Sequence, residues 1–326
     1  MGRAITACST PTRLQMASPR PSTAPFPSPP PAPTRPADSV SRLLAFLAST
    51  PAVDLSQGLG PRLVPGARLG RFALAHELGR GRSGVVYEAL DLERERPVAL
   101  KVLTPGPSGA PRGAAWAQRE AADFKRLDHP NIVALQGVGT CHSGAYLVFE
   151  LLRGRTLRLR LADGPLDLGG ALRIAGDVGR ALAHAHAVGV VHRGLTAAKV
   201  FVCDDGAVKV LDFSPGRRLP SNSEVGSGPE VSPEQQAGWP GDERSDLYAL
   251  TVLLQQMLTA TTGAGRAAHP NGVAVPRRLR RLLVAGLAPD PLDRPSSALD
   301  WLDELAAVRS GLAGHWPWRG LFSSAI

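Results

Sequence analysis

The sequence predicts an α+β fold with two lobes, a small β-rich lobe followed by a larger α-helical lobe. From Leu69 onward, short apolar runs typical of β-strands are separated by glycines, and from about Leu166 to Val308 the apolar spacing becomes mostly helical. With 326 residues, 43% of them hydrophobic, the chain can bury a substantial core. Strands and helices that segregate along the chain in this way are typical of α+β proteins.

Composition narrows the class of protein. The net charge is +9, but the arginines are scattered except within 277–281, where leucine interrupts the run. This spacing favours the exposed face of an amphipathic helix over a nucleic-acid patch. Three cysteines far apart form neither a disulfide scaffold nor a zinc site, which is typical of a reducing cytoplasm. Since no apolar stretch approaches the ~18 to 20 residues that cross a bilayer, we expect a cytoplasmic protein without a membrane span or a specific nucleic-acid partner.

The first 68 residues divide into two predicted segments. Residues 1–37 contain no acidic residue and a Pro/Ser/Ala run, which predicts a disordered tail because such a composition cannot bury enough apolar surface. An organelle transit peptide and a translation start at Met16 are open alternatives. Residues 38–68 are predicted to form a short amphipathic helix and a linker. The apolar face of this helix either packs on the following domain or binds a partner.

A glycine-rich hairpin is predicted at residues 77–89. Gly79, Gly81 and Gly84 give the spacing G-x-G-x-x-G, in which the missing Cβ atoms let the backbone approach phosphate oxygens closely. A dinucleotide-binding fold uses a similar spacing but needs a helix directly after the glycines. Here Val85–Tyr87 continue as a strand, so the pattern favours a hairpin that covers the phosphates of a nucleotide.

A single lysine lies in the middle of the next predicted strand, Val98–Leu103. A buried cation of this kind is costly unless it pairs with a carboxylate or meets an anionic ligand. The candidate partner of Lys101 is Glu120, on the helix that is predicted to follow.

At this point the sequence resembles the Ser/Thr protein kinases of the bacterial, Hanks type. The resemblance rests on the glycine hairpin, Lys101, Glu120 and the run His129-Pro130-Asn131-Ile132-Val133, which have the spacing of that family. It implies a bilobal kinase fold. The implied boundaries are 69–308 for the kinase-like domain, 69–150 for its small lobe, 151–308 for its large lobe and 309–326 for a C-terminal tail.

The resemblance implies that ATP binds between the lobes. Lys101 would hold the α- and β-phosphates and pair with Glu120. Phe149 would be the gatekeeper at the end of the last strand, and the backbone at Glu150 and Leu152 would meet the adenine edge. The residues expected to bind the nucleotide are Gly79, Gly81, Gly84, Val86, Ala99, Lys101, Glu120, Phe149, Glu150, Leu152, Lys199 and Phe201.

The catalytic loop departs from the family pattern at both of its reactive positions. Kinases read H-R-D-L-x-x-x-N here, with the aspartate as base and the asparagine on a metal ion. This chain reads His192-Arg193-Gly194-Leu195-Thr196-Ala197-Ala198-Lys199. Gly194 has no side chain to accept a proton, and Lys199 puts a cation where a metal ligand belongs. We therefore expect no intact catalytic residue in this loop. Loss of a general base alone typically lowers the rate by roughly 10²- to 10⁴-fold.

One candidate metal ligand remains, Asp212, in the triplet Asp212-Phe213-Ser214 that stands where kinases read D-F-G. We therefore expect ATP as the nucleotide, with weak or absent magnesium binding. An alternative is that Lys199 replaces the metal by contacting a phosphate directly.

The large lobe keeps the residues that hold a kinase fold together. Glu234 and Arg294 are expected to form a buried ion pair, and Asp246 is expected to hold the catalytic loop. The segment 214–231 corresponds to an activation segment, whose serines are either phosphate acceptors or part of a flexible loop. Residues 260–274 are shorter than the substrate-docking region of the family.

Three functions are consistent with this pattern. The first is a catalytically impaired pseudokinase that regulates or scaffolds a protein partner, either an active kinase or its substrate. The second is a residual Ser/Thr kinase that transfers the γ-phosphate of ATP with a substitute base, for which Asp204, Asp205 and Glu224 are candidates. The aspartates are predicted to lie on a hairpin turn that faces away from the phosphates. The third is another phosphoryl or nucleotidyl transfer that uses ATP in an altered pose.

Overall fold

The computed structural model describes residues 66–81, 84–103, 118, 121–122, 124–141, 144–213, 228–259 and 275–313. Several predicted features lie outside these ranges, namely the N-terminal tail and helix, Glu120, Ser214 and the serines of the activation segment, residues 260–274, and the chain beyond 313.

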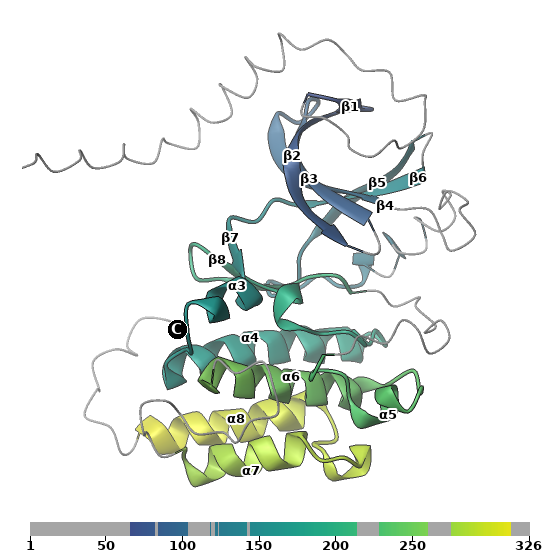
Figure 1. Cartoon of the computed structure of the whole chain (residues 1–326). Coiled ribbons are helices and arrows are strands. Elements are labelled where there is room, and N and C mark those ends of the chain that lie inside the picture. Colours follow the sequence, from purple (N-terminus) through teal and green to yellow (C-terminus); the bar gives the residue numbers. More distant parts are fainter. Residues whose placement is uncertain are drawn as a thin grey trace, which may run out of the picture.

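The small lobe is an antiparallel sheet, drawn at the top of Figure 1. Within the described residues, six strands pair in the order β1-β2-β3-β4-β6-β5. Their bounds are Arg68–Leu69 (β1), Phe72–Gly81 (β2), Gly84–Asp91 (β3), Arg96–Leu103 (β4), Leu135–Cys141 (β5) and Gly144–Glu150 (β6).

Strand β4 shows why the small lobe forms a sheet. Val98, Leu100 and Val102 are buried in the lobe's own apolar cluster, whereas the intervening Ala99 and Lys101 lie on the opposite face. Alternation with a period of two therefore gives one face to the core and leaves the other face for a functional site.

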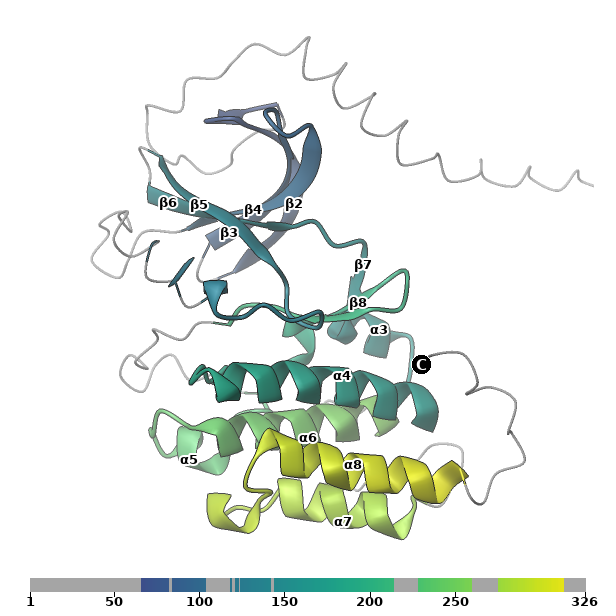
Figure 2. The same ribbon diagram turned by 180° about the vertical axis from the view of Figure 1, so that it is seen from behind.

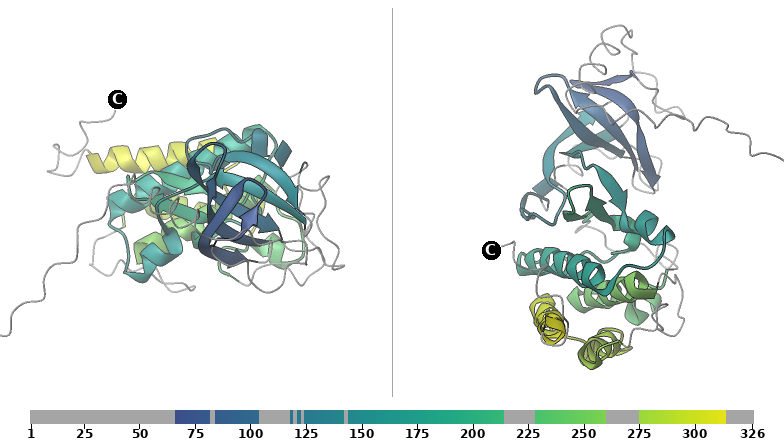
Figure 3. Two further views of the ribbon diagram at one scale, coloured as in Figure 1. Left: turned by 90° about the horizontal axis from the view of Figure 1, so that it is seen from above. Right: turned by 90° about the vertical axis from the view of Figure 1, so that its left-hand side faces the viewer.

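The large lobe consists of helices below a small three-stranded sheet, as the right-hand view of Figure 3 shows. The strands are Gly154–Thr156 (β7), Val200–Cys203 (β8) and Val208–Val210 (β9). The helices are Leu157–Ala162 (α3), Leu168–Ala187 (α4), Ala197–Lys199 (η1), Pro233–Gln236 (α5), Glu243–Thr259 (α6), Arg277–Gly286 (α7), Pro291–Asp293 (η2) and Ala298–Ala313 (α8).

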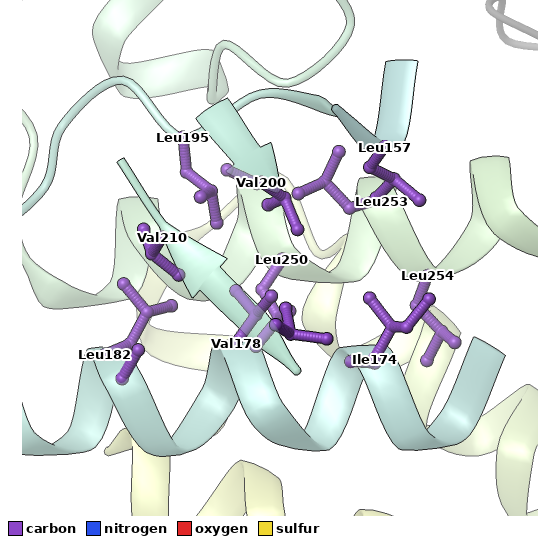
Figure 4. Packing of buried hydrophobic residues seen from close by; sticks show 14 of the residues in the cluster. Leu157, Ile174, Val178, Leu182, Leu195, Val200, Val210, Leu250, Leu253 and Leu254 are labelled. Carbon is purple, nitrogen blue, oxygen red and sulfur yellow. The ribbon is translucent and has the colours of Figure 1, made fainter. Parts of the chain in front are cut away.

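The core of the large lobe forms around α4. Ile174, Val178 and Leu182 repeat every four residues, so they share one face of this helix. In Figure 4 this face meets Val200 and Val210 of the small sheet and three leucines of α6. Helix α8 packs along α4 from the other side, as Figure 2 shows. The small sheet is therefore fixed on a rigid helical base.

Three connections, among others, join the two lobes. The Asn131 side chain donates a hydrogen bond to the Val208 carbonyl (2.9 Å), and Ile132 forms a parallel bridge with Val210. In addition, Arg153 donates to both carboxylate oxygens of Glu88, on β3, at 2.8 and 3.1 Å. The large lobe is thus joined to two separate segments of the small lobe, residues 131–132 and strand β3.

The two-lobed fold predicted from the sequence is confirmed. The predicted exposed arginine face is also confirmed, because α7 exposes its arginines and buries Leu279, Leu282 and Leu283. Among the helices that the structure describes, none combines the length and the apolar character needed to cross a membrane. The exact domain boundaries stay predictions.

Candidate nucleotide site and catalytic loop

The glycines at the end of β2 and the start of β3 differ in what surrounds them. Among the described residues, a Cβ atom added at Gly79 or Gly81 would meet nothing within 4 Å, so this part of the chain leaves open space beside the backbone there. A Cβ at Gly84 would lie 2.2 Å from the Val102 carbonyl oxygen, so this position requires glycine for packing against β4. The first two glycines are therefore the ones that leave room for a ligand.

Four of the predicted nucleotide-binding residues share one face of the sheet. Val86 is the cross-strand partner of Lys101, and Ala99 is the partner of Phe149. Partners in adjacent strands lie on the same face, and Ala99 and Lys101 are two residues apart on β4. The Phe149 ring packs edge-on against Phe124 with ring centroids 5.3 Å apart. The sheet therefore presents a largely apolar surface with one lysine.

The segment after β6 begins the connection to the large lobe. The Glu150 N–H donates to the Ala134 carbonyl (3.1 Å), and its carboxylate accepts from Lys209 (2.7 Å). Leu152 is half-buried against the main core. From the large lobe, Phe201 on β8 is half-buried as well. The predicted adenine-contacting residues thus come from a segment whose position is fixed by hydrogen bonds.

Lys101 forms an ion pair with Asp212. The lysine is 9% exposed, and its ammonium group contacts Oδ1 of Asp212, which follows β9 in the large lobe. Burial alone would raise the pKa of the Asp212 carboxyl, but the charges of Lys101 and Lys199 outweigh burial and lower it. This pairing joins the two lobes inside the site. The predicted partner Glu120 lies outside the described residues.

The catalytic loop is held by Asp246 of α6. Its carboxylate accepts hydrogen bonds from the backbone N–H groups of His192 (2.8 Å) and Arg193 (2.7 Å) and contacts Nε2 of His186 (2.9 Å). Arg193 has a φ of 58°, a conformation that L-residues rarely adopt. The prediction that Asp246 ties down this loop is confirmed, and the loop keeps a strained geometry.

His192 is a neutral histidine with both ring nitrogens engaged. Nε2 lies 3.1 Å from the Leu211 carbonyl, so it must carry the proton, and Nδ1 accepts from the Gly194 N–H at 3.3 Å. Burial first, and then the nearby charge of Lys199, lowers the pKa of His192 from 6.5 to about 4. The ring also packs on Phe213, with centroids 4.7 Å apart.

Gly194 and Lys199 meet in space. A Cβ atom at Gly194 would lie 3.1 Å from Nζ of Lys199, which is closer than most Cβ contacts. The lysine is placed there by the short helix η1 and by a hydrogen bond from the Leu211 N–H to its carbonyl oxygen (2.8 Å). A cation therefore lies directly beside the position from which the side chain of an aspartate at 194 would extend.

The large-lobe ion pair is also as predicted. Arg294, whose side chain is fully buried, donates to both carboxylate oxygens of Glu234 at 2.8 Å. Ser245 donates to the same carboxylate at 2.5 Å. Burial opposes ionisation of Glu234, but the hydrogen bonds from Arg294 and Ser245 outweigh it and lower the pKa to about 2.

Sequence reasoning missed two features of the site. The ion pair between Glu88 and Arg153 joins a strand to the segment after β6, and nothing in their spacing indicates it. The proximity of Gly194 to Lys199 was also missed, although both residues were singled out. The signal for the second feature was present, because a residue without a side chain and a long cation stand five positions apart in one tight loop.

Residues 72–296 match the protein kinase domain family, and the chain belongs to that family. It is 31% identical over 257 residues to serine/threonine-protein kinase PrkC of Bacillus subtilis, covering 71% of this chain and 39% of PrkC. It is 30% identical over 266 residues to PknL of Mycobacterium tuberculosis, covering 74% of this chain and 67% of PknL. The chain thus spans about two fifths of the length of PrkC.

Solved structures agree with the fold. The crystal structure of the Mycobacterium tuberculosis PknI kinase domain superposes with a TM-score of 0.62 at 24% identity, covering 76% of this chain and 100% of that domain. The predicted membership of the bacterial Ser/Thr kinase family and the bilobal kinase fold are therefore confirmed.

Proposed function

We propose that this chain is a nucleotide-binding pseudokinase that acts on a protein partner by binding and not by phosphoryl transfer. The observation that carries the proposal is the contact between Gly194 and Lys199. Gly194 has no side chain to act as a base, and an ammonium group, which cannot accept a proton from a substrate hydroxyl, lies 3.1 Å from the place that a Cβ atom at 194 would take.

Several features of the site support the binding of a nucleotide. Lys101 is buried beside Asp212, the glycines at 79 and 81 leave open space, and the apolar face of the sheet carries Val86 and Ala99. These features suit the adenine and phosphates of ATP. Bound nucleotide would link Lys101 on the small lobe to the loop at 192–199 on the large lobe. Such a link would favour one lobe arrangement, and with it one surface for a partner.

The site does not suit a catalytic magnesium ion. Magnesium takes oxygen ligands in octahedral geometry, whereas Lys199 stands at one of the two positions from which kinases supply a ligand. The other position, Asp212, is paired with Lys101. No step of phosphoryl transfer is therefore assigned to a metal ion in this chain.

The residual-kinase alternative needs a substitute base. Asp204 and Asp205 occupy the turn between β8 and β9, where the Asp205 carboxylate accepts from the Ala207 N–H (2.9 Å). The hairpin predicted for these residues is confirmed. Glu224 lies outside the described residues. No described contact brings either aspartate to Gly194, which favours the binding role.

The test is incorporation of label from γ-labelled ATP, with magnesium and separately with manganese. The native chain should give no more label than Lys101→Ala, while ATP binds the native chain and not the variant. Label that appears in the native chain and disappears in Lys101→Ala would establish a kinase and overturn the proposal. Label transferred from the α-position would indicate nucleotidyl transfer instead.

A further inference from the structure

Glu88 stands on the same face of the small-lobe sheet as the predicted nucleotide-binding residues. On β3, Tyr87 and Ala89 are buried in the small lobe's own apolar cluster, so Val86 and Glu88 lie on the opposite face. The cross-strand partner of Glu88 on β4 is Ala99, which therefore shares that face. An acidic side chain is thus a direct neighbour of the residues expected to cover the adenine ring.

The Glu88 carboxylate is paired with an arginine of the large lobe. Glu88 is only 6% exposed, and both of its oxygens accept hydrogen bonds from Arg153, at 2.8 and 3.1 Å. A carboxylate this buried is costly without a cationic partner, and two-pronged pairing with arginine is the stronger geometry. Nε2 of His76 also lies 3.6 Å from one carboxylate oxygen. The side chains of His76 and Arg153 are both more than half exposed, so the pair lies where the sheet face meets solvent.

Each member of the pair is fixed within its own lobe. Strand β3 is paired along its length with β2 and β4. In the large lobe, the Arg153 carbonyl accepts from the Asp204 N–H (3.0 Å). The next residue, Gly154, pairs with Cys203, and a Cβ atom there would lie 2.3 Å from the Val202 carbonyl oxygen, so this position requires glycine. When the lobes separate at this edge, the pair therefore has to break.

The expected nucleotide position lies between two ion pairs that join the lobes. Lys101 pairs with Asp212 at the end where phosphates are expected. Arg153 directly follows Leu152, whose backbone is expected to meet the adenine edge, so the pair with Glu88 lies at the other end. Because a ligand held between two lobes exchanges when they open, each of these pairs can limit the rate of exchange.

We propose that the pair of Glu88 with Arg153 is a latch across the adenine end of the nucleotide site, which opens before a nucleotide enters or leaves. The inference rests on the proposed nucleotide-binding function and specifies how exchange at that site is controlled. The latch joins two protein groups and makes no contact with the ligand. It therefore slows entry and exit equally and leaves the affinity nearly unchanged. In a protein that acts by binding, slow exchange maintains one lobe arrangement, and with it one partner surface.

The test is stopped-flow fluorescence of the full chain with ATP that carries a fluorophore on its γ-phosphate, away from the adenine end. Dissociation is followed after a chase with unlabelled ATP. Arg153→Met keeps most of the side-chain stem and removes the guanidinium. Its association and dissociation rate constants should both rise about three- to fivefold, while Kd changes by less than about twofold, since an ion pair with one exposed partner is worth about that much. Glu88→Gln should act in the same direction.

Two further variants are the controls. Arg155 lies in the same segment but pairs with Asp163, within the large lobe, so Arg155→Met leaves the lobes joined and should exchange nucleotide as the native chain does. The double variant Glu88→Gln, Arg153→Met leaves no unpaired carboxylate, and its rate constants should equal those of Arg153→Met, because the second change removes nothing further. Thermal melting establishes that each variant is folded before rate constants are compared.

The outcomes separate this inference from the function on which it rests. Binding by the native chain with rate constants that neither Arg153→Met nor Glu88→Gln changes would overturn the latch and leave a nucleotide-binding pseudokinase. Faster dissociation with unchanged association would also overturn it, because Arg153 would then contact the nucleotide itself. A native chain that binds neither the labelled nor the unlabelled ATP would overturn both the latch and the nucleotide-binding part of the proposed function.

Discussion

The anchors of the large lobe and the catalytic loop lie next to each other but differ in what they retain. Glu234 and Arg294 form a two-pronged ion pair, and Asp246 holds two consecutive backbone N–H groups of the loop. The loop that Asp246 holds has a glycine at the base position and a lysine at the metal-ligand position. Within the described residues, the anchors of a kinase fold are thus retained around a loop that departs from the family pattern at two positions.

This difference shows that the backbone geometry of the loop does not require an aspartate at 194 or an asparagine at 199. Arg193 has a strained backbone and the His192 ring makes both hydrogen bonds, although residue 194 is a glycine. The strain at Arg193 is maintained by Asp246 and by the Gln235 amide, which donates to the Arg193 carbonyl (3.0 Å). We expect substitutions in the anchors to reduce stability strongly and substitutions in the loop to change ligand binding with little loss of stability.

The largest loss of stability is expected for Arg294→Met. This change leaves the Glu234 carboxylate without its main partner in a buried site, which costs about 3 to 5 kcal/mol of unfolding free energy. Urea unfolding followed by circular dichroism measures the loss. Arg281→Met, on the exposed face of α7, is the matched control and should change the unfolding free energy by less than about 0.5 kcal/mol. Equal effects of the two substitutions would mean that the ion pair does not anchor the lobe.

A smaller loss is expected for Asp246→Asn. The amide keeps one acceptor oxygen but brings an NH₂ group to the other position, where it faces an N–H of the catalytic loop. We expect a loss of about 1 to 3 kcal/mol, together with faster hydrogen exchange of the His192 and Arg193 amides. Unchanged protection of these two amides would show that the loop holds its conformation without Asp246.

The smallest effect is a pH dependence that His192 contributes. Its pKa is about 4 in the folded chain and ordinarily 6.5, so the unfolded chain takes up a proton over this range and the folded chain does not. Stability is therefore present above pH ~6.5 and is lost as the pH falls toward 4, by about 1 kcal/mol between pH 7 and pH 5.5. His192→Phe should be less sensitive to pH in the same interval. Equal slopes of unfolding free energy against pH for both chains would contradict the assignment of a neutral, buried His192.

The sequence predicted those site and anchor residues that stand at the same spacing as in the kinase family. The strand with Lys101 was predicted from its apolar pattern, whereas the anchor Asp246 and the pair of Glu234 with Arg294 were predicted from the resemblance to the kinase family. Physical reasoning from burial supported them, since a charge in an apolar strand or helix needs a partner.

The rest of the site depends on side-chain directions that spacing alone does not give. The contact between Gly194 and Lys199 depends on the short helix η1, which turns the lysine back toward the start of the loop. The pair of Lys101 with Asp212 depends on how far the lobes are closed. The pair of Glu88 with Arg153 joins segments 65 residues apart, and neither segment carries a motif for it.

We propose that the loop from His192 to Lys199 lacks phosphoryl-transfer chemistry while the described anchors of the fold around it are retained. The most direct test compares the native chain with the Gly194→Asp, Lys199→Asn double variant in transfer from γ-labelled ATP to a generic protein substrate. The account predicts no transfer by the native chain above the Lys101→Ala background and measurable transfer by the double variant. Transfer by the native chain that Lys101→Ala abolishes would contradict it.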